Sequence, residues 1–305
     1  MSQQIFSNMI SQALTNKVLK SLSSLNYTYG ENPSRYSFSG TFKESLINNH
    51  VDKEVSVVSS SVLEVKMKKS DYLSAIITDL HFGRQRVFQQ NQNIQSQIDS
   101  GQQAAWILVS TYYASYFLAC DIAKLSGQFI TNLTASNIQS LLSNTVEGNP
   151  NSFKSDSDTS LAVTVSLSEF QNEVCLRLAR TAAKPHKVAW HNLFGVLREV
   201  RIESYEISLD RLRDIVSADS TKWKLPSTVR NEWNYSAVYL YGDKGDKLAS
   251  DFIKMLKSPG SSIKRFRNNT LHPSEENITS SIAYVYEVLN SSYSNITKRI
   301  FNASK

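Results

Sequence analysis

Apolar residues recur at steps of three and four along the C-terminal segment of the chain. They are Ile278, Ile282, Val285, Leu289, Tyr293, Ile296 and Ile300. Since an α-helix turns once every 3.6 residues, this spacing puts all seven on one face. Pro273, Glu275 and Glu276 suit the start of such a helix, because carboxylates favour the positive end of its dipole. The pattern predicts one long helix whose apolar face packs against other helices.

Further helical patterns fill most of the chain after Gln102. Residues 104–125 are apolar on nearly all sides and stop before Gly127, as a buried central helix should. We expect additional helices over residues 134–143, 169–184, 185–200, 209–217, 226–242 and 247–256. Together these segments predict a mainly α protein in which the C-terminal two-thirds is an all-α bundle held by packing.

The first part of the chain has a different character. Valines and other apolar residues alternate with polar ones over residues 53–68, which predicts two short strands or a hairpin. A glutamine-rich stretch, residues 84–103, is typical of a linker or of a solvated helix start. We therefore expect a small N-terminal α+β unit over residues 1–90 and a helical domain over residues 91–305. An irregular insertion is expected near residues 144–167, ending in an alternating, strand-like run.

Composition narrows the class of protein. Hydrophobic residues make up 41% and charged residues 20%, as in ordinary globular proteins. The most apolar stretch is interrupted by polar residues, so no membrane span is expected, and the N-terminus lacks the pattern of a secretory signal. Cys120 and Cys175 are too few for a disulfide framework and too isolated for a zinc site. A reducing, cytoplasmic compartment fits best, with no metal and no cofactor.

The positive charge is concentrated in one sector. The formal net charge is +6, yet residues 177–272 hold 18 Lys and Arg against 10 Asp and Glu, or +8. Such a sector would attract a polyanion in a salt-dependent way. The simpler interpretation is a set of solvated helix faces.

The segment RFRNNTLHP, residues 265–273, lies where one helical pattern stops and another begins. Arg267 and His272 are five residues apart, which in a continuous helix would separate their directions by roughly 140°. Pro273 disfavours the helical conformation at His272 and starts a new element. The histidine can then turn towards the face that carries Arg267, so that both side chains could meet one phosphate.

These residue types suit RNA cleavage without a metal. A histidine can accept the proton of a ribose 2′-hydroxyl or protonate the departing 5′-oxygen, because its pKa lies near the working pH. An arginine fork matches two oxygens of the increasingly negative phosphate. Asn268 could bond to the histidine or to a phosphate oxygen, and Lys264 and Arg265 could hold the flanking RNA backbone.

A purely structural interpretation remains open for the same residues. A helix-end arginine and a loop histidine can each be satisfied by local carboxylates such as Glu275. A second Arg–His pair at similar spacing, Arg180 and His186, also argues against reading the spacing alone as a site. The asparagine directly after Arg267 is what sets the first pair apart.

Arg267-Asn268-x-x-x-His272-Pro273, followed by two glutamates and a long final helix, resembles the signature of the HEPN superfamily. Residues 110–127 and the stretch RNEWNYSAVYLYG, residues 230–242, are similar to helices of that family. The resemblance covers about residues 102–305. It implies a bundle of four to five helices that dimerises with both signatures at one composite cleft. It also implies a metal-independent endoribonuclease that acts as a toxin, an abortive-infection effector or another antiphage defence.

The resemblance assigns roles to individual residues. Arg267 would bind phosphate, Asn268 would orient, and His272 would transfer the proton. Arg230 would contribute to RNA binding, although core packing is as good an interpretation of its stretch. Toxins paired with a nucleotidyltransferase antitoxin have a tyrosine where this chain has Ser274, so that antitoxin type is not inferred. An antitoxin or another defence-system partner otherwise remains open.

Two other functions remain as alternatives. The first is a non-catalytic HEPN-like module that binds a nucleotide, a nucleic acid or a partner protein. The second is a helical scaffold or regulatory subunit in which Arg267 and His272 serve structure. Loss of RNA cleavage on substitution of His272 would separate the nuclease from both.

Overall fold

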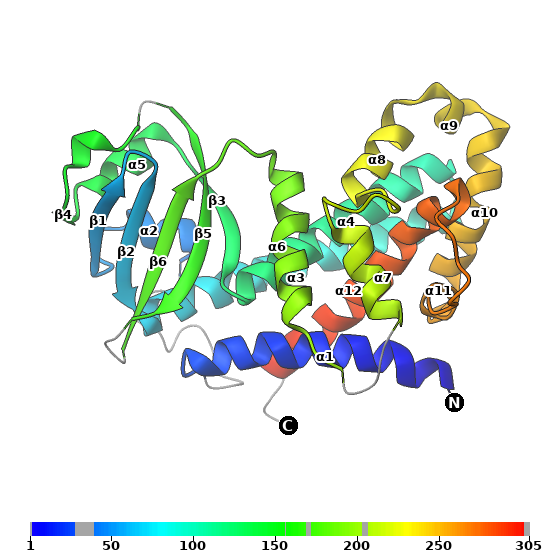
Figure 1. Ribbon diagram of the computed structural model, residues 1–305, viewed down its shortest axis with the longest axis horizontal. Helices are drawn as coiled ribbons and strands as arrows, with labels where there is room; N and C mark the ends of the chain where they lie inside the picture. The colour runs from blue at the N-terminus through cyan, green and yellow to red at the C-terminus, as the bar shows by residue number, and fades with distance from the viewer. Residues whose placement is uncertain (1, 28–39, 156, 169–171, 203–206, 302–305) are drawn as a thin grey trace. The chain divides into compact units, whose positions relative to one another are not determined.

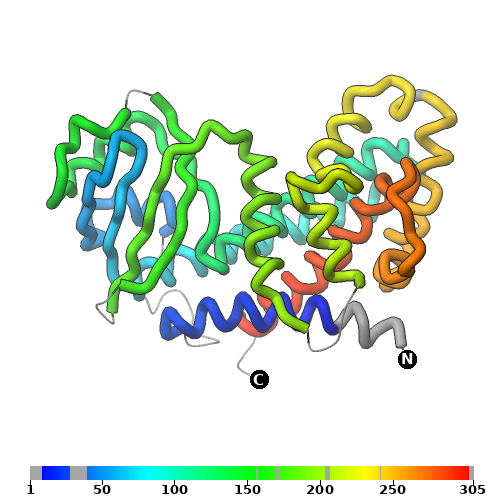
Figure 2. The backbone as a smooth tube through the Cα atoms, in the orientation of Figure 1, coloured from blue at the N-terminus to red at the C-terminus, as the bar shows by residue number. Residues whose placement is uncertain are grey.

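The structure of the protein is a computed structural model that describes residues 2–27, 40–155, 157–168, 172–202 and 207–301 (Figure 1, Figure 2). The chain is 64% helical and 15% strand. Its elements follow in the order α1 (Ser2–Ser24), α2 (Phe42–Ile47), β1 (Lys53–Ser59), β2 (Val62–Lys68), α3 (Lys69–Asp99), α4 (Ala104–Leu125), β3 (Gln128–Leu133), α5 (Ala135–Leu142), β4 (Thr145–Glu147), a 3-10 turn (Pro150–Ser152), β5 (Thr159–Leu167), β6 (Glu173–Arg180), α6 (Pro185–Glu199), α7 (Ile207–Val216), α8 (Pro226–Tyr235), α9 (Ala237–Tyr241), α10 (Asp243–Lys257), α11 (Ser261–Phe266) and α12 (Glu275–Phe301).

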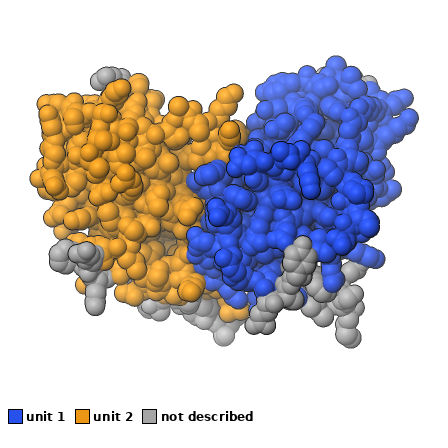
Figure 3. Space-filling model, viewed as in Figure 1, with its two compact units in different colours: residues 1–18, 84–122, 189–298 blue, residues 19–83, 123–188, 299–305 orange. Residues whose placement is uncertain are grey.

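The chain forms two compact units, coloured separately in Figure 3. Unit 1 consists of residues 1–18, 84–122 and 189–298, and unit 2 consists of residues 19–83, 123–188 and 299–305. Each unit therefore draws on segments from both sides of residue 90. Whether the predicted division into residues 1–90 and 91–305 describes separate folding units remains a prediction.

Unit 2 is built on a six-stranded mixed sheet with the strand order β3-β5-β6-β2-β1-β4. The pairs β3–β5, β5–β6, β6–β2 and β2–β1 are antiparallel, whereas the short edge strand β4 runs parallel to β1. Figure 1 shows the hairpin β1–β2 beside β6. Strands from the first 70 residues and from residues 128–180 thus complete one sheet.

One face of this sheet is buried, as the alternation of side chains along each strand dictates. Val174, Leu176 and Leu178 of β6 are buried, while the residues between them are not. On the buried side the ring of Phe42 from α2 packs edge-on against Phe129 of β3, with 4.7 Å between the ring centroids. The other face carries polar pairs that join neighbouring strands, including Arg177 with Glu64, whose nearest atoms are 3.1 Å apart.

The sheet overturns the prediction of a mainly α fold. The protein is neither all-α nor a HEPN-like helical bundle with a small N-terminal α+β unit, because one six-stranded sheet joins strands of the first 70 residues to strands of the expected helical domain. The stretch 169–184, expected to be helical, contains strand β6. The expected insertion near residues 144–167 holds β4 and β5, both of them strands of this sheet.

The physical reason is that β6 satisfies two patterns at once. Val174 and Leu178 are four residues apart, which fits a helix, while Val174, Leu176 and Leu178 alternate, which fits a strand. Pairing decides between the two, because β6 lies between β2 and β5 and bonds to both. Most of the glutamine-rich stretch, residues 84–99, lies in the 31-residue helix α3 and is therefore not a linker.

Unit 1 contains the helices that bear on the predicted site. Helix α12 begins close to the expected residue, and six of its seven predicted stripe residues are buried, Ile278 being the partly exposed one. In its interior the carboxylate of Asp121 on α4 accepts from Arg86 on α3 at 3.2 Å and from the Tyr293 hydroxyl on α12 at 3.0 Å. This buried group links three helices of the unit, since a buried carboxylate needs partners.

Helix ends follow local sequence signals where these are strong. The chain leaves α4 through Gly127, whose φ of +80° is a left-handed conformation that glycine adopts without strain. Proline opens α6 and α8, as expected from Pro185 and Pro226. Helix α8 ends earlier than expected, at Tyr235, and α9 follows it. Among the helices that the structure describes, none is both long and apolar enough to cross a membrane.

Candidate functional site

The predicted site lies on the connection between α11 and α12, within unit 1. Helix α11 ends at Phe266, and the backbone N–H of Arg267 still donates to Ile263 at 3.0 Å. Two tight turns follow, with the N–H of Asn268 bonded to the Arg265 carbonyl at 3.0 Å and the N–H of Leu271 bonded to the Asn268 carbonyl at 3.2 Å. The predicted change from one helix to another is therefore confirmed.

The three predicted catalytic residues all lie on this connection, residues 267–274. Arg267, Asn268 and His272 are each exposed to solvent. The side-chain oxygen of Asn268 accepts from the N–H and the hydroxyl of Thr270, at 3.0 and 2.9 Å. Asn268 thus stabilises the first turn of the connection, a role typical of asparagine, and these bonds do not involve His272.

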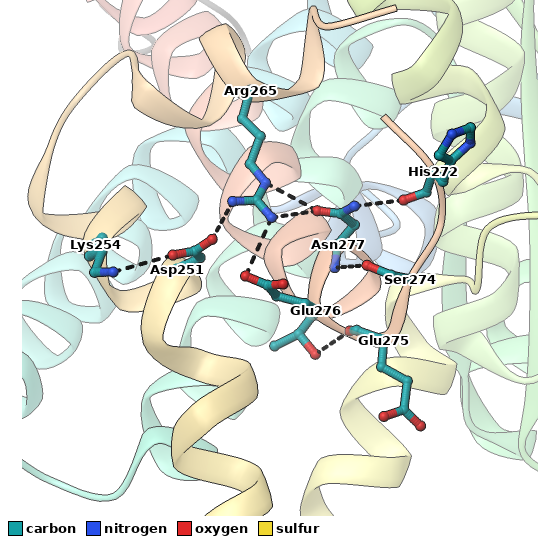
Figure 4. Close-up of polar contacts among 9 residues, drawn as sticks. Asp251, Lys254, Arg265, His272, Ser274, Glu275, Glu276 and Asn277 are labelled. Atoms are coloured by element: carbon teal, nitrogen blue, oxygen red, sulfur yellow. Dashed lines mark hydrogen bonds and ion pairs between the residues drawn. The ribbon is translucent and has the colours of Figure 1, made fainter. Parts of the chain in front are cut away.

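The backbone at His272 is held tightly although its side chain is exposed. The carbonyl oxygen of His272 accepts from the N–H of Ser274 at 2.9 Å and from the side-chain amide of Asn277 at 2.6 Å. Both lone pairs of that oxygen are engaged, and Pro273 restricts the backbone of the residue before it. Figure 4 shows the carbonyl facing Asn277 and the imidazole pointing away from it.

Ser274 and Asn277 also start helix α12. The Ser274 hydroxyl accepts from the N–H of Asn277 at 3.2 Å, so it caps the first turn. Glu275 on the same turn pairs with Lys244 of α10, with a shortest distance of 2.9 Å. The carboxylate proposed as a structural partner of His272 therefore contacts a lysine instead.

Arg265, predicted to hold RNA, makes an internal network. Its guanidinium donates to the side-chain oxygen of Asn277 at 3.1 and 2.6 Å, pairs with Asp251 of α10, and lies 3.5 Å from Glu276 (Figure 4). Its side chain is 28% exposed. The neighbouring Lys264, the other residue predicted to bind RNA here, is exposed.

Two carboxyl groups of this network interact directly. The hydrogen bond to Asp251, together with burial, raises the pKa of Glu276 above its usual value. The same bond, and then Arg265, lowers the pKa of Asp251. As pH falls, Glu276 therefore takes up a proton before Asp251 does, and Asp251 keeps its charge facing Arg265.

Arg211 of α7 holds the connection from its other side, and nothing in the sequence marked it. Its guanidinium donates to the carbonyls of Phe266 at 2.6 Å and Asn268 at 2.8 Å, and lies 3.5 Å from that of Leu271. Arg213, two residues further along α7, bonds to the carbonyls of Leu197 and Val200 at the end of α6. Helix α7 thus supplies cations to two helix C-termini, where carbonyls lack intrahelical partners.

Helix α11 is fixed at its other end by Glu287 of α12. This carboxylate accepts from the N–H of Gly260 and from the hydroxyl of Ser262. Burial raises the pKa of Glu287, and the bonds to Gly260 and Ser262 oppose that rise. At the C-terminal end Phe266 stacks on Tyr284 with 4.6 Å between the ring centroids. The short helix α11 is therefore fixed at both ends, and residues 267–274 follow its fixed C-terminal end.

Arg230, the third residue predicted to bind RNA, lies elsewhere in unit 1. It is 8% exposed on α8, and its guanidinium carbon is 5.2 Å from the ring centre of Tyr112 and 5.3 Å from that of Tyr113. Burial raises the pKa of Tyr112 to about 12. This arrangement is a buried cation–π cluster, and it corresponds to the core-packing interpretation of this stretch.

The residues of the second Arg–His pair lie on different elements. Arg180 lies at the end of β6 and donates to the carbonyl of Lys154, whereas His186 lies on α6. Within the described residues, no three His, Cys, Asp or Glu side chains are grouped as metal ligands. Cys120 and Cys175 are not joined in a disulfide.

Comparisons with known proteins add no assignment. No protein-family model, no curated protein and no solved structure matches this chain. The resemblance to the HEPN superfamily consequently rests on the sequence motifs alone, at residues 267–273, 110–127 and 230–242.

Proposed function

We propose that the α11–α12 connection is the active site of a metal-independent endoribonuclease, with His272 as the proton-transfer residue and Arg267 as the phosphate-binding residue. The observation that carries the proposal is the exposure of Arg267, Asn268 and His272 on one connection whose backbone carbonyls are bonded by Arg211 of α7 and Asn277 of α12. Functional side chains are commonly carried on loops that a rigid scaffold positions.

The reaction follows from the chemistry of these groups. The ribose 2′-oxygen attacks the adjacent phosphorus, the bond from phosphorus to the 5′-oxygen breaks, and a 2′,3′-cyclic phosphate and a 5′-hydroxyl result. His272 takes the proton from the 2′-hydroxyl or gives one to the 5′-oxygen, and water completes the other transfer. Arg267 stays charged and stabilises the phosphate as negative charge accumulates on its oxygens.

Exposed basic residues around the connection favour an RNA substrate over a neutral one. Lys264 lies on the preceding helix and is exposed, and the connection belongs to the sector of +8 charge. Contacts of this kind bind the phosphate backbone irrespective of base sequence. The substrate is RNA. By the same signature, the protein acts as a toxin or in antiphage defence, and it forms a homodimer with two such sites. None of this depends on the all-α bundle, which the sheet excludes.

Purified full-length chain and a labelled single-stranded RNA, with EDTA present, provide the test. The expected result is cleavage that ends in a 2′,3′-cyclic phosphate and that stops when the attacking ribose is replaced by deoxyribose. His272→Ala and Arg267→Ala should each lower the rate by about 100-fold or more, the usual range for a general acid or base. His186→Ala is the matched control and should cleave like the parent.

Each other outcome has a definite meaning. Unchanged cleavage by His272→Ala would refute the assignment. RNA binding without cleavage by the parent would instead indicate a binding module. A lowered melting temperature of the variants without cleavage or binding by the parent would indicate a scaffold.

A further inference from the structure

Asn277 connects the Arg265 network to the backbone of His272. It lies in the first turn of α12 and is 9% exposed. Its oxygen accepts two bonds from Arg265, and its NH₂ group donates to the His272 carbonyl. Both the oxygen and the NH₂ group of the Asn277 amide are therefore hydrogen-bonded.

Arg265 determines which way that amide faces. A guanidinium has only hydrogen-bond donors, so the edge of Asn277 that faces it must be the oxygen. The NH₂ group is then directed at the His272 carbonyl, which has only acceptor sites. Reversing the amide would set donor against donor and acceptor against acceptor, at a cost of all three hydrogen bonds.

Arg265 is itself held by carboxylates from two further helices. Asp251 of α10 pairs with it, and Glu276 of α12 lies 3.5 Å away. Lys254 lies 3.4 Å from Asp251 on the solvent side. Turning the guanidinium away would break its contacts with both carboxylates and leave Asp251 with only the more exposed Lys254, which favours the direction observed.

We propose that Asn277 is a positioning residue for His272 and that Arg265 acts through Asn277, rather than by holding RNA. The catalytic consequence rests on the proposed function, whereas the conformational claim concerns His272 alone. With its carbonyl fixed by Asn277, Ser274 and Pro273, the backbone of His272 has one orientation, and the imidazole projects from the opposite side of the chain (Figure 4). A displacement of about 1 Å at such a residue can cost about 100-fold in rate.

Three variants test the two contacts of Asn277, the one with Arg265 and the one with the His272 carbonyl. Asn277→Ala removes both contacts. Asn277→Asp retains an acceptor for Arg265 but loses the donor to His272, so it tests the link to the histidine alone. Glu275→Gln is the matched control, because Glu275 lies in the same helical turn and contacts Lys244 instead.

The direct measurement is the NMR signal of the His272 ring in full-length protein with labelled histidines. The chain has five histidines, and His272→Ala assigns the signal. Asn277→Ala and Asn277→Asp should shift or broaden this signal, while Glu275→Gln should leave it as in the parent. Melting temperatures of all variants separate this effect from general destabilisation, and Asn277→Asp decides the question if Asn277→Ala does not fold.

Cleavage kinetics provide the second readout. For both Asn277 variants we expect kcat to fall about 10- to 100-fold with KM changed less than about twofold. Ring signals and kcat that match the parent in both Asn277 variants would overturn the positioning role while leaving the nuclease proposal intact. Absence of cleavage by the parent would refute the nuclease proposal, and the NMR signal would still decide whether Asn277 orients His272.

Discussion

Arg211 offers the sharpest test of how the connection is stabilised, because its guanidinium contacts three backbone carbonyls there. Replacing it by methionine keeps the apolar part of the side chain and removes every donor. The bond to Phe266 is partly buried, the bond to Asn268 is exposed, and the contact with Leu271 at 3.5 Å is weak. A charged donor contributes about 1.5 to 3 kcal/mol when shielded and much less in water. The loss should therefore be about 2 kcal/mol.

That magnitude sets two measurable effects. The melting temperature of Arg211→Met should fall by about 4 °C, given the usual entropy of unfolding for a chain of this size. Locally, a loss of about 2 kcal/mol corresponds to roughly 25-fold faster hydrogen exchange in residues 267–274, if this segment opens on its own. The amide of Leu271 is the best reporter, because its bond to the Asn268 carbonyl closes the second turn.

Mass-resolved hydrogen exchange on the full-length chain measures this effect. Lys222→Met is the matched control, since it also replaces a positive charge by methionine, but at an exposed side chain outside the connection. Arg211→Lys should give an intermediate result, because an ammonium cannot span carbonyls as a planar guanidinium does. If Arg211→Met melts within about 1 °C of the parent and exchanges at the parent's rate, the carbonyl contacts contribute nothing and the reasoning is refuted.

Two further predictions concern the other end of α11. Glu287 has a raised pKa in the folded protein, so its protonated form contributes stability that is complete below about pH 4.5 and is lost as pH rises through the raised value. In Glu287→Gln this loss of stability with rising pH should disappear, which urea unfolding across pH 4 to 8 would measure. If the free energy of unfolding of the variant depends on pH as steeply as that of the parent, the assignment is wrong. Gly260→Ala should cost about 1 kcal/mol, because φ is +85° and an added Cβ meets no atom within 4 Å. Gly101→Ala is equally free of contacts and should cost a similar amount, whereas Gly148→Ala would bring a Cβ to 2.5 Å from the Val57 carbonyl and should cost clearly more in the same melting experiment.

Parts of the site could be predicted from its sequence. Pro273 indicated that a new element starts after residue 272, and α11 and α12 are indeed separate helices. The roles of the two arginines could not be predicted. Arg265 and Arg267 have the same chemistry two residues apart, and what distinguishes Arg265 is its bonds to Asp251 and Asn277.

Arg211 could not be predicted for a related reason. Its partners are three carbonyls, which every residue has, so no residue type in the connection reveals the contact. An arginine on an amphipathic helix normally indicates a solvated face. Only because α7 packs beside the end of α11 does that guanidinium donate to the backbone carbonyls of the connection.

Local periodicity was enough to determine the long helices α4 and α12, because a helix bonds within itself and its buried face appears directly in the spacing of apolar residues. The six-stranded sheet was decided by tertiary structure, since a strand bonds only to segments far away in sequence. Val174, Leu176 and Leu178 became strand residues when β2 and β5 supplied those bonds. The inward direction of Arg265 was decided in the same way, because burying a guanidinium requires carboxylates that other helices bring to it.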